Sequence, residues 1–323
     1  MTSGVADTIL VTGATGFVGT ALVASLLSEQ QNVCAVVRAA TSKIPSAAGQ
    51  LQMDDLSVLS DWTEKLDGID CIVHLAARVH VMKETVANPL TAFRQVNVDG
   101  TLHLASQAAK AGVRRFIFLS SVKVNGEYSL PEHPFKESDI ANPQDAYGLS
   151  KLEAEQGLLL IAQQTGMDVV IIRPPLVYGP QVKANFASMM RAVKLGLPLP
   201  LAAIHNSRSF VYVGNLVNLI ATCIQHPAAA NQVFLVSDGC DLSTTQLLNE
   251  CTTAMGVRAR LWPFPQRLIE LFAALVGKRD VGQRLCGNLQ VDIAKAGHLL
   301  GWAPPFTLKD GLKDTALAFL KKR

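Results

Sequence analysis

Apolar and polar positions along the first 180 residues follow two different periods. Short runs rich in Val and Ile are typical of buried strands, whereas apolar residues repeating every three or four positions are typical of helices that pack through one face. The strand-like runs are residues 9–12, 33–37, 71–75, 116–119 and 169–172, and the helical patterns are residues 20–29, 88–112 and 147–165. Because the two kinds alternate, the pattern predicts an α/β fold with a doubly wound parallel sheet, helices on both faces and right-handed connections.

The pattern loosens after about residue 180, where prolines interrupt it. Helical patterns continue at residues 184–196, 214–226, 244–255 and 264–277. We therefore predict a larger domain, residues 1–180, and a smaller lobe, residues 181–323. Strand-like runs at 210–213 and 233–236 are candidates to rejoin the sheet of the first domain. A ligand cleft is expected between the two parts, at the carboxyl ends of the strands.

Three glycines at three-residue spacing follow the first strand-like run and precede the first helical pattern. In the order strand, glycine turn, helix, Gly13 permits a tight turn, Gly16 lets the backbone approach a pyrophosphate, and Gly19 lets the helix pack closely on the strand. The start of the helix then offers free N–H groups to phosphates. This arrangement predicts that residues 1–180 form a Rossmann-type dinucleotide-binding domain.

A second motif with chemical potential lies at residues 120–151. Tyr147 and Lys151 are four residues apart in a helical pattern, so their side chains share one face. A nearby lysine can lower the pKa of a phenol, which is otherwise about 10. A hydroxyl from Ser120 or Ser121 can bond the same reacting oxygen. Together these groups can move a proton while a hydride moves to or from a nicotinamide.

Bulk composition excludes several classes of protein. The chain has 323 residues, a net charge of +3 and six scattered cysteines without a C-x-x-C pair. Such a mild charge argues against nucleic-acid binding, and the cysteines are expected to be reduced thiols. No apolar stretch is long enough to span a bilayer and no signal peptide is evident, so we expect a cytoplasmic protein without membrane insertion. The histidines lack ligand spacing, so no metal site is expected.

These pieces together resemble the extended short-chain dehydrogenases/reductases, in particular the NAD(P)-dependent nucleotide-sugar epimerase/dehydratase family. The resemblance runs through almost the whole chain and depends on the order and spacing of several modest motifs. They are Thr12-Gly13-Ala14-Thr15-Gly16-Phe17-Val18-Gly19, His74-Leu75-Ala76-Ala77, Asn97, Ser120-Ser121, Tyr147 with Lys151, Arg173-Pro174-Pro175-Leu176-Val177-Tyr178-Gly179-Pro180, Arg208-Ser209-Phe210-Val211-Tyr212-Val213 and Leu300-Gly301-Trp302.

The resemblance implies roles for the matching positions. Tyr147 would be the general acid/base at a sugar hydroxyl or ketone, Lys151 would bind the nicotinamide ribose and keep Tyr147 partly ionised, and Ser121 would be the second catalytic hydroxyl. The positions implied to bind the cofactor are Gly13, Thr15, Gly16, Phe17, Val18, Gly19, Arg38, Asp55, Leu56, Leu75, Ala76, Ala77, Asn97, Tyr147, Lys151 and Pro174.

The end of the second strand-like run bears on the choice of cofactor. NAD-specific sites usually have an acidic residue there, which bonds the ribose 2′-hydroxyl. Here the run ends in Val36-Val37-Arg38. Because an arginine suits a 2′-phosphate, we expect NADP(H) to be slightly favoured over NAD(H).

The second half of the chain suggests a nucleotide-sugar substrate. By the resemblance, Arg208 would grip the substrate pyrophosphate, with Arg284 as a second phosphate-binding arginine. Two positive charges converging on a pyrophosphate make chemical sense. The positions expected to contact substrate are Val79, Ser121, Lys123, Asn185, Leu199, Leu201, Arg208 and Arg284. His80, in the same segment as Val79, is a further candidate but more simply a structural residue.

The residues after Ser121 narrow the reaction. Dehydratases of this family follow the catalytic hydroxyl with an Asp-Glu pair, whereas here Val122-Lys123 follow, so 4,6-dehydration is not expected. Hydride transfer at C4 of a UDP-sugar remains. The strings at 77–82 and 120–127 resemble bacterial enzymes that reduce UDP-4-keto-6-deoxy-N-acetylhexosamines for O-antigen synthesis, which is our leading expectation. UDP-hexose or UDP-N-acetylhexosamine 4-epimerisation is the alternative, and reduction of a non-nucleotide ketone is the second alternative.

In the family the helices expected near 88–112 and 147–165 pair across a two-fold axis. Small residues, which we expect on the outward faces of these helices, suit such a contact. They are Ala105, Ala108, Ala109 and Ala154. The resemblance therefore implies a homodimer.

Overall fold

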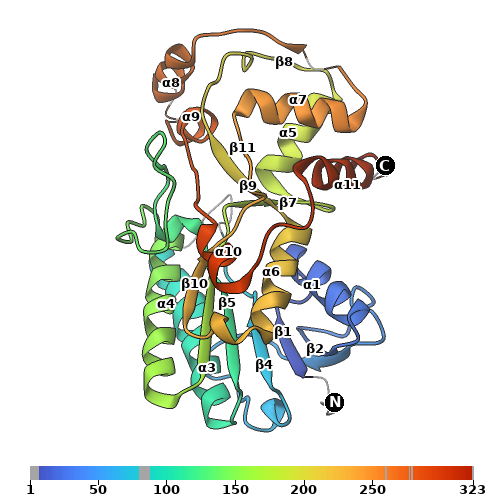
Figure 1. Ribbon diagram of the computed structural model, residues 1–323, viewed down its shortest axis with the longest axis vertical. Coiled ribbons are helices and arrows are strands. Elements are labelled where there is room, and N and C mark those ends of the chain that lie inside the picture. Colours follow the sequence, from blue (N-terminus) through green and yellow to red (C-terminus); the bar gives the residue numbers. More distant parts are fainter. Residues whose placement is uncertain (1–6, 80–87, 259, 276, 278, 322–323) are drawn as a thin grey trace.

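The computed structural model describes residues 7–79, 88–258, 260–275, 277 and 279–321. Its core is a seven-stranded sheet in which every pair of neighbours is parallel (Figure 1). In spatial order the strands are β10 (Gln232–Leu235), β6 (Asp168–Arg173), β5 (Arg115–Leu119), β4 (Cys71–His74), β1 (Thr8–Thr12), β2 (Asn32–Val37) and β3 (Gly49–Gln52). The order reverses at β1 and β4, and the carboxyl ends of strands at such a reversal are where a ligand cleft is expected.

Helices cover both faces of this sheet, and each face has its own apolar core. Alternate side chains of β1 point to opposite faces: Ile9 and Val11 belong to one core, and Leu10 to the other. The first core includes residues from α1 (Phe17–Ser28) and α6 (Val213–Gln225). Residues of α3 (Thr101–Lys110) and α4 (Ala146–Thr165) contribute to the second, and α2 (Pro89–Arg94) precedes a π-helical segment, Gln95–Gly100.

The small residues of α3 and α4 were expected on outward faces, and this is wrong for three of them. Ala105, Ala108 and Ala154 are fully buried in the second core. Ala109 is partly buried and packs against the same core. Small side chains let both helices lie close to the sheet and to each other, so these alanines serve the monomer's own packing.

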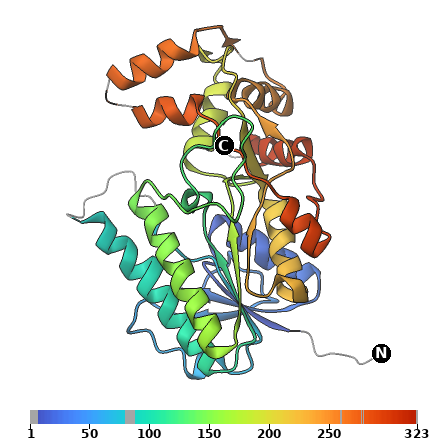
Figure 2. The same cartoon turned by 60° about the vertical axis from the view of Figure 1, so that its left-hand side comes forward.

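The second part of the chain builds a lobe above the carboxyl ends of the strands (Figures 1 and 2). A three-stranded sheet, β11-β9-β7, and the pair β8–β12 lie in it. Its elements are β7 (Leu176–Tyr178), α5 (Ala184–Lys194), β8 (Pro198–Leu199), β9 (Arg208–Tyr212), β11 (Asp241–Leu242), α7 (Thr244–Met255), β12 (Arg260–Leu261), α8 (Gln266–Leu275), α9 (Arg279–Cys286) and α11 (Leu308–Lys321).

Of the two late strands considered for the main sheet, one lies there and one does not. β10 pairs with β6 at the sheet's edge, whereas β9 pairs with β7 and β11 in the lobe. After β10 the chain enters the lobe, and α10 (Ala294–Leu300) then packs back on β10. The chain therefore crosses between the two parts repeatedly, and β9 stays in the lobe because its partner β7 leaves the sheet directly after β6.

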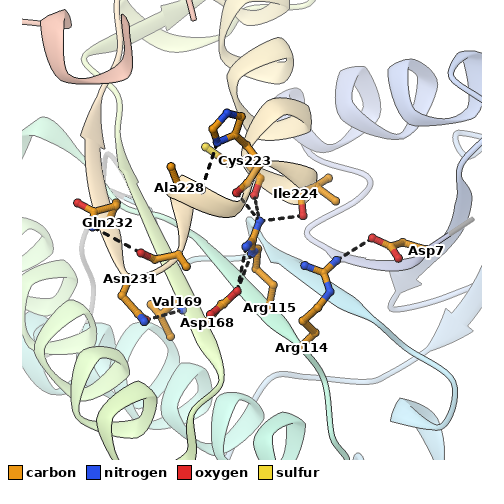
Figure 3. Close-up of polar contacts among 12 residues, drawn as sticks. Asp7, Arg114, Arg115, Asp168, Val169, Cys223, Ile224, Ala228, Asn231 and Gln232 are labelled. Atoms are coloured by element: carbon orange, nitrogen blue, oxygen red, sulfur yellow. Dashed lines mark hydrogen bonds and ion pairs between the residues drawn. The ribbon is translucent and has the colours of Figure 1, made fainter. Parts of the chain in front are cut away.

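At the opposite end of the sheet a buried arginine ties α6 to β5 and β6 (Figure 3). Arg115 donates through Nη1 to the carbonyl oxygens of Cys223 (2.8 Å), Ile224 (3.0 Å) and His226 (3.0 Å). Its Nη2 donates to Oδ2 of Asp168 at 2.9 Å. A cation at a helix C-terminus satisfies carbonyls that lack a partner within the helix. This end of the fold is thus fixed independently of the cleft.

Candidate active site

The glycine turn joins β1 to α1 at the carboxyl edge of the sheet. Gly13 has a φ of +67°, and a Cβ there would lie 2.8 Å from the backbone nitrogen of Ala76. A Cβ on Gly19 would lie 2.2 Å from the carbonyl oxygen of Gly13. Gly16 precedes α1 as its N-cap and offers no side chain to cap the first N–H groups. The turn therefore forms a backbone cradle at a helix N-terminus, which fits the pyrophosphate of a dinucleotide.

Enlarging Gly19 tests this packing. We expect Gly19→Ala to push α1 away from β1, to lower the free energy of unfolding by about 1–3 kcal/mol and to weaken cofactor binding. The matched control is Gly297→Ala in α10, where the nearest atom to an added Cβ is 3.6 Å away. Thermal unfolding and a cofactor titration measure both effects. Equal behaviour of the two variants would contradict the close-packing argument.

A buried histidine fixes the chain at the end of β4. The Thr12 hydroxyl lies 2.8 Å from Nδ1 of His74, and the Thr101 hydroxyl lies 3.0 Å from Nε2. The Ala76 N–H donates to the Thr12 hydroxyl at 3.3 Å. Burial, and secondarily Lys151, lower the pKa of His74 to about 3, so the ring is neutral at physiological pH. It orients the partly buried residues Leu75, Ala76 and Ala77 beside the glycine turn.

Asn97, expected at the cofactor, lies fully buried in the π-helical segment. Its Oδ1 accepts from the Arg78 N–H (2.8 Å), and its Nδ2 donates to the Arg78 carbonyl (3.1 Å) and to the Ser150 hydroxyl (3.0 Å). The amide therefore ties the segment that follows β4 to α4. Val79, at the end of that segment, is exposed, and His80 lies outside the described residues.

Tyr147 and Lys151 lie together on the first turns of α4. Asp145 caps this helix by accepting from the Gly148 N–H at 2.6 Å. The ammonium of Lys151 donates to the carbonyl oxygen of Leu119 at 2.9 Å and lies 6.0 Å from the centre of the Tyr147 ring. It also lies 4.3 Å from the centre of the Phe118 ring. The end of β5 thus positions the lysine beneath the tyrosine.

The expected lowering of the Tyr147 pKa by Lys151 is not what this arrangement shows. Burial, and then the charge of Asp145, raise the pKa of Tyr147 to about 12. Burial lowers the pKa of Lys151 to about 7, while the nearby Glu155 opposes that shift. The phenol is therefore protonated at neutral pH, and the lysine titrates in the physiological range, because burial disfavours the charged form of each group.

A buried ion pair lies directly behind Lys151 on α4. Glu155 accepts three hydrogen bonds from Arg173: from Nε to Oε1 at 3.0 Å, from Nε to Oε2 at 3.2 Å and from Nη2 to Oε2 at 2.5 Å. The Ser120 hydroxyl donates to Oε1 of Glu155 at 2.5 Å, and Arg173 Nη1 donates to the Asn125 side chain at 3.1 Å. These bonds join α4, the ends of β5 and β6, and the loop after Ser121. These bonds hold in place the part of α4 that carries Tyr147 and Lys151.

Lys123, expected to reach the substrate, instead forms ion pairs within the protein. Its ammonium contacts Oε1 of Glu127 at 2.7 Å and the carboxylate of Asp145. Burial lowers the pKa of Lys123, but the contacts with Asp145 and Glu127 outweigh that effect and raise it. Lys123 therefore neutralises the carboxylate that lies two residues before Tyr147.

This contact predicts opposite pH shifts for two variants. Asp145→Asn keeps a cap for α4 but removes the negative charge that raises the Tyr147 pKa, so that pKa should fall. The limb of the pH–activity profile that reports Tyr147 should then move to lower pH. Lys123→Met leaves Asp145 less neutralised, so the limb should move to higher pH. The pH dependence of kcat/KM measures both. Shifts in the same direction would contradict the proposed coupling.

The remaining hydroxyl and the proline of the motif line the same end of the sheet. The Ser121 oxygen accepts from the Lys123 N–H at 3.2 Å and caps the short 3₁₀ turn Val122–Val124. The Pro174 carbonyl accepts from the Val122 N–H at 3.0 Å. Both residues therefore lie where the chain leaves β5 and β6, near the start of α4.

The predicted phosphate-binding arginines lie near one another in the lobe. Nη1 of Arg208 donates to the Gly287 carbonyl at 2.9 Å. Burial lowers the Arg208 pKa, and the charge of the exposed Arg284 lowers it further, while Glu127 and Tyr128 act in the opposite direction. Two cations whose charges act on one another would both be able to pair with a diphosphate.

The other expected substrate contacts are spread through the lobe. Asn185 is exposed in the first turn of α5. Leu199 and Leu201 are partly buried and pack against the lobe's apolar core. The structure therefore gives both leucines a packing role in addition to any contact with a ligand.

The expected adenine-side residues lie beyond β2 and β3. Arg38 directly follows β2 and is exposed, as Thr15 is in the glycine turn. Asp55 is exposed, and its Oδ1 accepts from the Ser60 hydroxyl at 3.1 Å. The carbonyl of Leu56 would lie 2.1 Å from a Cβ on Gly100, so this loop packs tightly against the π-helical segment. Phe17 and Val18 pack against the first core from the start of α1.

Sequence reasoning missed Asp145, Glu155 and the role of Arg173. Asp145 had a local signal, because an aspartate directly before a helical pattern is a common N-cap. Glu155 is four residues after Lys151 and so shares its face of α4, but its partner on β6 is evident only from the fold.

The described part of the chain contains neither a cluster of metal-ligating side chains nor a membrane-spanning helix. No group of three or more His, Cys, Asp or Glu side chains there is placed to hold a metal ion. Within residues 7–321, apart from those left undescribed, no helix has the length and apolar character needed to cross a bilayer.

Comparison with known proteins agrees with this geometry. The profile of the NAD dependent epimerase/dehydratase family matches residues 9–237. A UDP-glucose 4-epimerase of Vibrio cholerae is 51% identical over 315 residues, which cover 97% of this chain and 95% of that protein. An N-acetyl-alpha-D-glucosaminyl-diphospho-ditrans,octacis-undecaprenol 4-epimerase of Escherichia coli O157:H7 is 28% identical, with 96% and 94% covered.

A solved structure shares the fold. The UDP-glucose 4-epimerase of Thermotoga maritima, determined with UDP-glucose, is 23% identical and superimposes with a TM-score of 0.78 over 97% of this chain and 99% of that one. Its likeness extends over the sheet and the lobe alike. The family profile and the 51% identity show that the chain belongs to the NAD-dependent epimerase/dehydratase family.

Proposed function

We propose that the protein is a UDP-sugar 4-epimerase. The observation that carries this proposal is the 51% identity to a UDP-glucose 4-epimerase over 97% of the chain. The arrangement of Tyr147 and Lys151 supports it, because proton transfer at a hydroxyl suits either epimerisation or reduction. The identity favours epimerisation, so this replaces reduction of a UDP-4-keto-6-deoxy-N-acetylhexosamine as the leading assignment.

The cleft residues can perform the proton transfers that such a reaction needs. The glycine turn and the start of α4 would hold the dinucleotide cofactor, which would supply reversible hydride transfer at C4. Tyr147 would take the C4 hydroxyl proton as the carbonyl forms and give it back after the sugar presents its other face. Lys151, when charged, favours the phenolate, and Ser121 would bond the same oxygen.

Arg208 and Arg284 would hold the diphosphate of the substrate. Their mutual repulsion falls when a diphosphate binds between them, so binding should gain from both charges. Arg208→Ala is therefore expected to raise the substrate KM roughly tenfold or more, as expected for loss of a charged hydrogen bond. Cofactor affinity should stay unchanged, and a parallel loss of cofactor affinity in a titration would contradict this role.

The choice between NAD and NADP rests on one residue. The family is described as NAD dependent, whereas the exposed Arg38 after β2 supports NADP(H). Identifying the cofactor released from purified protein, and titrating cofactor-free protein with NAD⁺ and with NADP⁺, decides between them. A preference for NAD⁺ of about tenfold or more would overturn the NADP(H) proposal, since it would show that Arg38 meets no 2′-phosphate.

One incubation series tests the proposed reaction. UDP-glucose, UDP-galactose and their N-acetylated forms are each incubated with the protein without added cofactor, and the C4 isomers are separated by chromatography. We expect interconversion of at least one pair. In a parallel reaction with a UDP-4-keto-6-deoxy-N-acetylhexosamine, stoichiometric NADPH oxidation without isomer formation in the first series would instead identify a reductase.

We also propose a homodimer through α2, α3 and α4. The alanines that suggested it are buried, so the proposal now depends on the outer surface of α4, where Leu160 is 56% exposed. Light scattering at micromolar concentration measures the mass. A monomer mass, or a dimer that survives Leu160→Asp unchanged, would count against this interface.

A further inference from the structure

The helices α8 and α9 form a hairpin at the end of the lobe farthest from the main sheet (Figures 1 and 2). Four large apolar side chains of α8 are exposed: Leu268 (47%), Leu271 (56%), Phe272 (67%) and Leu275 (76%). Their spacing puts them on one face of the helix. No residue of α8 is buried. The helix therefore turns its apolar face to solvent, the reverse of what a helix packed on a core does.

The contact with α9 uses other positions of α8. A Cβ on Gly282 would lie 2.7 Å from Cβ of Ala273, so the two helices approach closely there. The Gln266 side chain donates to the Cys286 carbonyl at 3.3 Å. The hairpin is thus anchored at Cys286, which is buried, while the apolar face of α8 is left outside.

A further exposed aromatic residue precedes α8 by four positions in the chain. Trp262 is 47% exposed and follows β12. Its backbone N–H donates to the Leu199 carbonyl of β8 at 3.1 Å. Its ring packs edge-on against Phe264, with the centroids 5.6 Å apart. We name Trp262, Leu268, Leu271, Phe272 and Leu275 the lobe-tip patch.

Basic residues surround the lobe-tip patch. Residues 256–287 contain six basic and two acidic residues, so this segment has a net charge of +4, whereas the whole chain has +3. Five of the basic side chains are on the described surface and exposed, namely Arg258, Arg260, Arg267, Arg279 and Arg284. The rest of the molecule is therefore close to neutral or slightly acidic, and the positive charge is concentrated at the tip.

We propose that the lobe-tip patch docks this protein on an anionic lipid bilayer surface. Helices with exposed Leu and Phe, a nearby Trp and flanking arginines are typical of segments that lie in the interface of a membrane. Basic residues near anionic headgroups strengthen such binding by electrostatic attraction. The contact is peripheral, because the apolar face lies along the surface and inserts only its side chains.

Shape and charge favour a bilayer over other occupants. A projecting hairpin offers a protein partner little area, whereas stable interfaces need about 800 Å² from each partner. A second copy would face the same patch across a two-fold axis and bring arginines against arginines. A bilayer accommodates a projecting shape and offers phosphates to Arg258, Arg260, Arg267 and Arg279, whereas Arg284 is assigned to the substrate diphosphate.

The test is sedimentation of the full-length protein with lipid vesicles, in the absence of any sugar substrate, so that it does not depend on the proposed function. Vesicles contain phosphatidylcholine alone or mixed with phosphatidylglycerol. We expect binding to the anionic vesicles, weaker binding to the neutral ones and loss of binding as salt is raised. Absence of binding to anionic vesicles at low salt would overturn the proposal.

Matched variants locate the contact. Leu271→Asp/Phe272→Asp should weaken vesicle binding by about tenfold or more, because two apolar side chains no longer enter the interface. The control is Leu317→Asp/Leu320→Asp, which adds the same charge at exposed positions of α11, on another side of the lobe (Figure 1). Equal losses in both double variants would overturn the assignment to α8.

A charge variant and two control measurements separate membrane binding from misfolding and from self-association. Arg267→Gln/Arg279→Gln removes charge without touching the apolar face, so binding to anionic vesicles should fall while binding to neutral ones stays the same. Thermal unfolding of the α8 variants should match the wild type, since their side chains are exposed. If light scattering without lipid shows that Leu271→Asp/Phe272→Asp changes the oligomeric state, the patch is an interface between copies and the proposal fails.

Discussion

Replacing Tyr147 by phenylalanine is expected to lower kcat by roughly 10²- to 10⁴-fold, the range that general acid–base groups contribute. In the proposed mechanism, the phenol of Tyr147 exchanges a proton with the sugar hydroxyl; Asp145 caps the helix that carries this tyrosine, and Lys151 lies 6.0 Å from its ring centre. The change removes one oxygen and leaves the ring. Its edge-on contact with Phe93, at 6.0 Å between centroids, should persist. Cofactor and UDP affinities should therefore stay close to those of the wild type.

The matched control for this prediction is Tyr212→Phe. The Tyr212 hydroxyl donates to Asp314 at 2.6 Å, away from the Tyr147 site. This variant should keep kcat. Isomer formation over time measures turnover, and titrations with cofactor and with UDP measure binding. Substantial turnover by Tyr147→Phe would mean that another group transfers the proton, and the mechanism would be wrong.

Features set by local spacing could be predicted from the sequence. The strand, glycine turn and helix at residues 9–28 depend on neighbours only a few positions apart, and so does the shared face of Tyr147 and Lys151. The parallel sheet followed from the alternation of strand-like and helical segments. In each case the physical cause, a backbone approach or a helical period, acts within one element and is visible in the sequence itself.

Features set by the rotation and pairing of elements could not be predicted. Alanines are compatible with either face of a helix, so nothing local shows that Ala105 and Ala154 face the core. A strand-like run such as β9 does not reveal its partner. The sequence predicts that Lys123 contacts the substrate, because its ion pair with Asp145, 22 residues later in the chain, forms only in the fold. The pKa of Tyr147 likewise depends on burial, which the spacing of tyrosine and lysine does not give.

The predicted catalytic residues cannot distinguish an epimerase from a reductase, for a chemical reason. Both reactions need the same proton transfer at the C4 oxygen, so Ser121, Tyr147 and Lys151 serve either one. The difference lies in whether oxidised cofactor leaves between turnovers and whether the ketone can rotate in the cleft. These properties depend on many contacts of the lobe, so similarity over the whole chain is more informative than the motif.

The buried pair of Glu155 and Arg173 gives the second large prediction, on stability. Glu155→Gln is expected to lower the free energy of unfolding by about 3–5 kcal/mol, because it leaves the Arg173 guanidinium buried without its counter-charge. Both side chains are at least nine-tenths buried, so water cannot replace the lost partner. Because the charge of Glu155 also counteracts the lowering of the Lys151 pKa, its loss should lower that pKa further. Denaturant unfolding measures the first effect and the pH dependence of kcat/KM the second.

A double-mutant cycle separates the ion pair from simple loss of packing. Arg173→Met alone leaves the Glu155 carboxylate buried with only the Ser120 hydroxyl as a partner, so it should cost as much as Glu155→Gln. Glu155→Gln/Arg173→Met contains no unpaired charge and should cost far less than the two single changes together. Strict additivity would show that the charges do not interact across α4 and β6. Non-additive changes in the free energy of unfolding would show that this pair stabilises the fold. A pH profile that shifts only in the variants lacking Glu155 would show that Glu155 also adjusts the charge of Lys151.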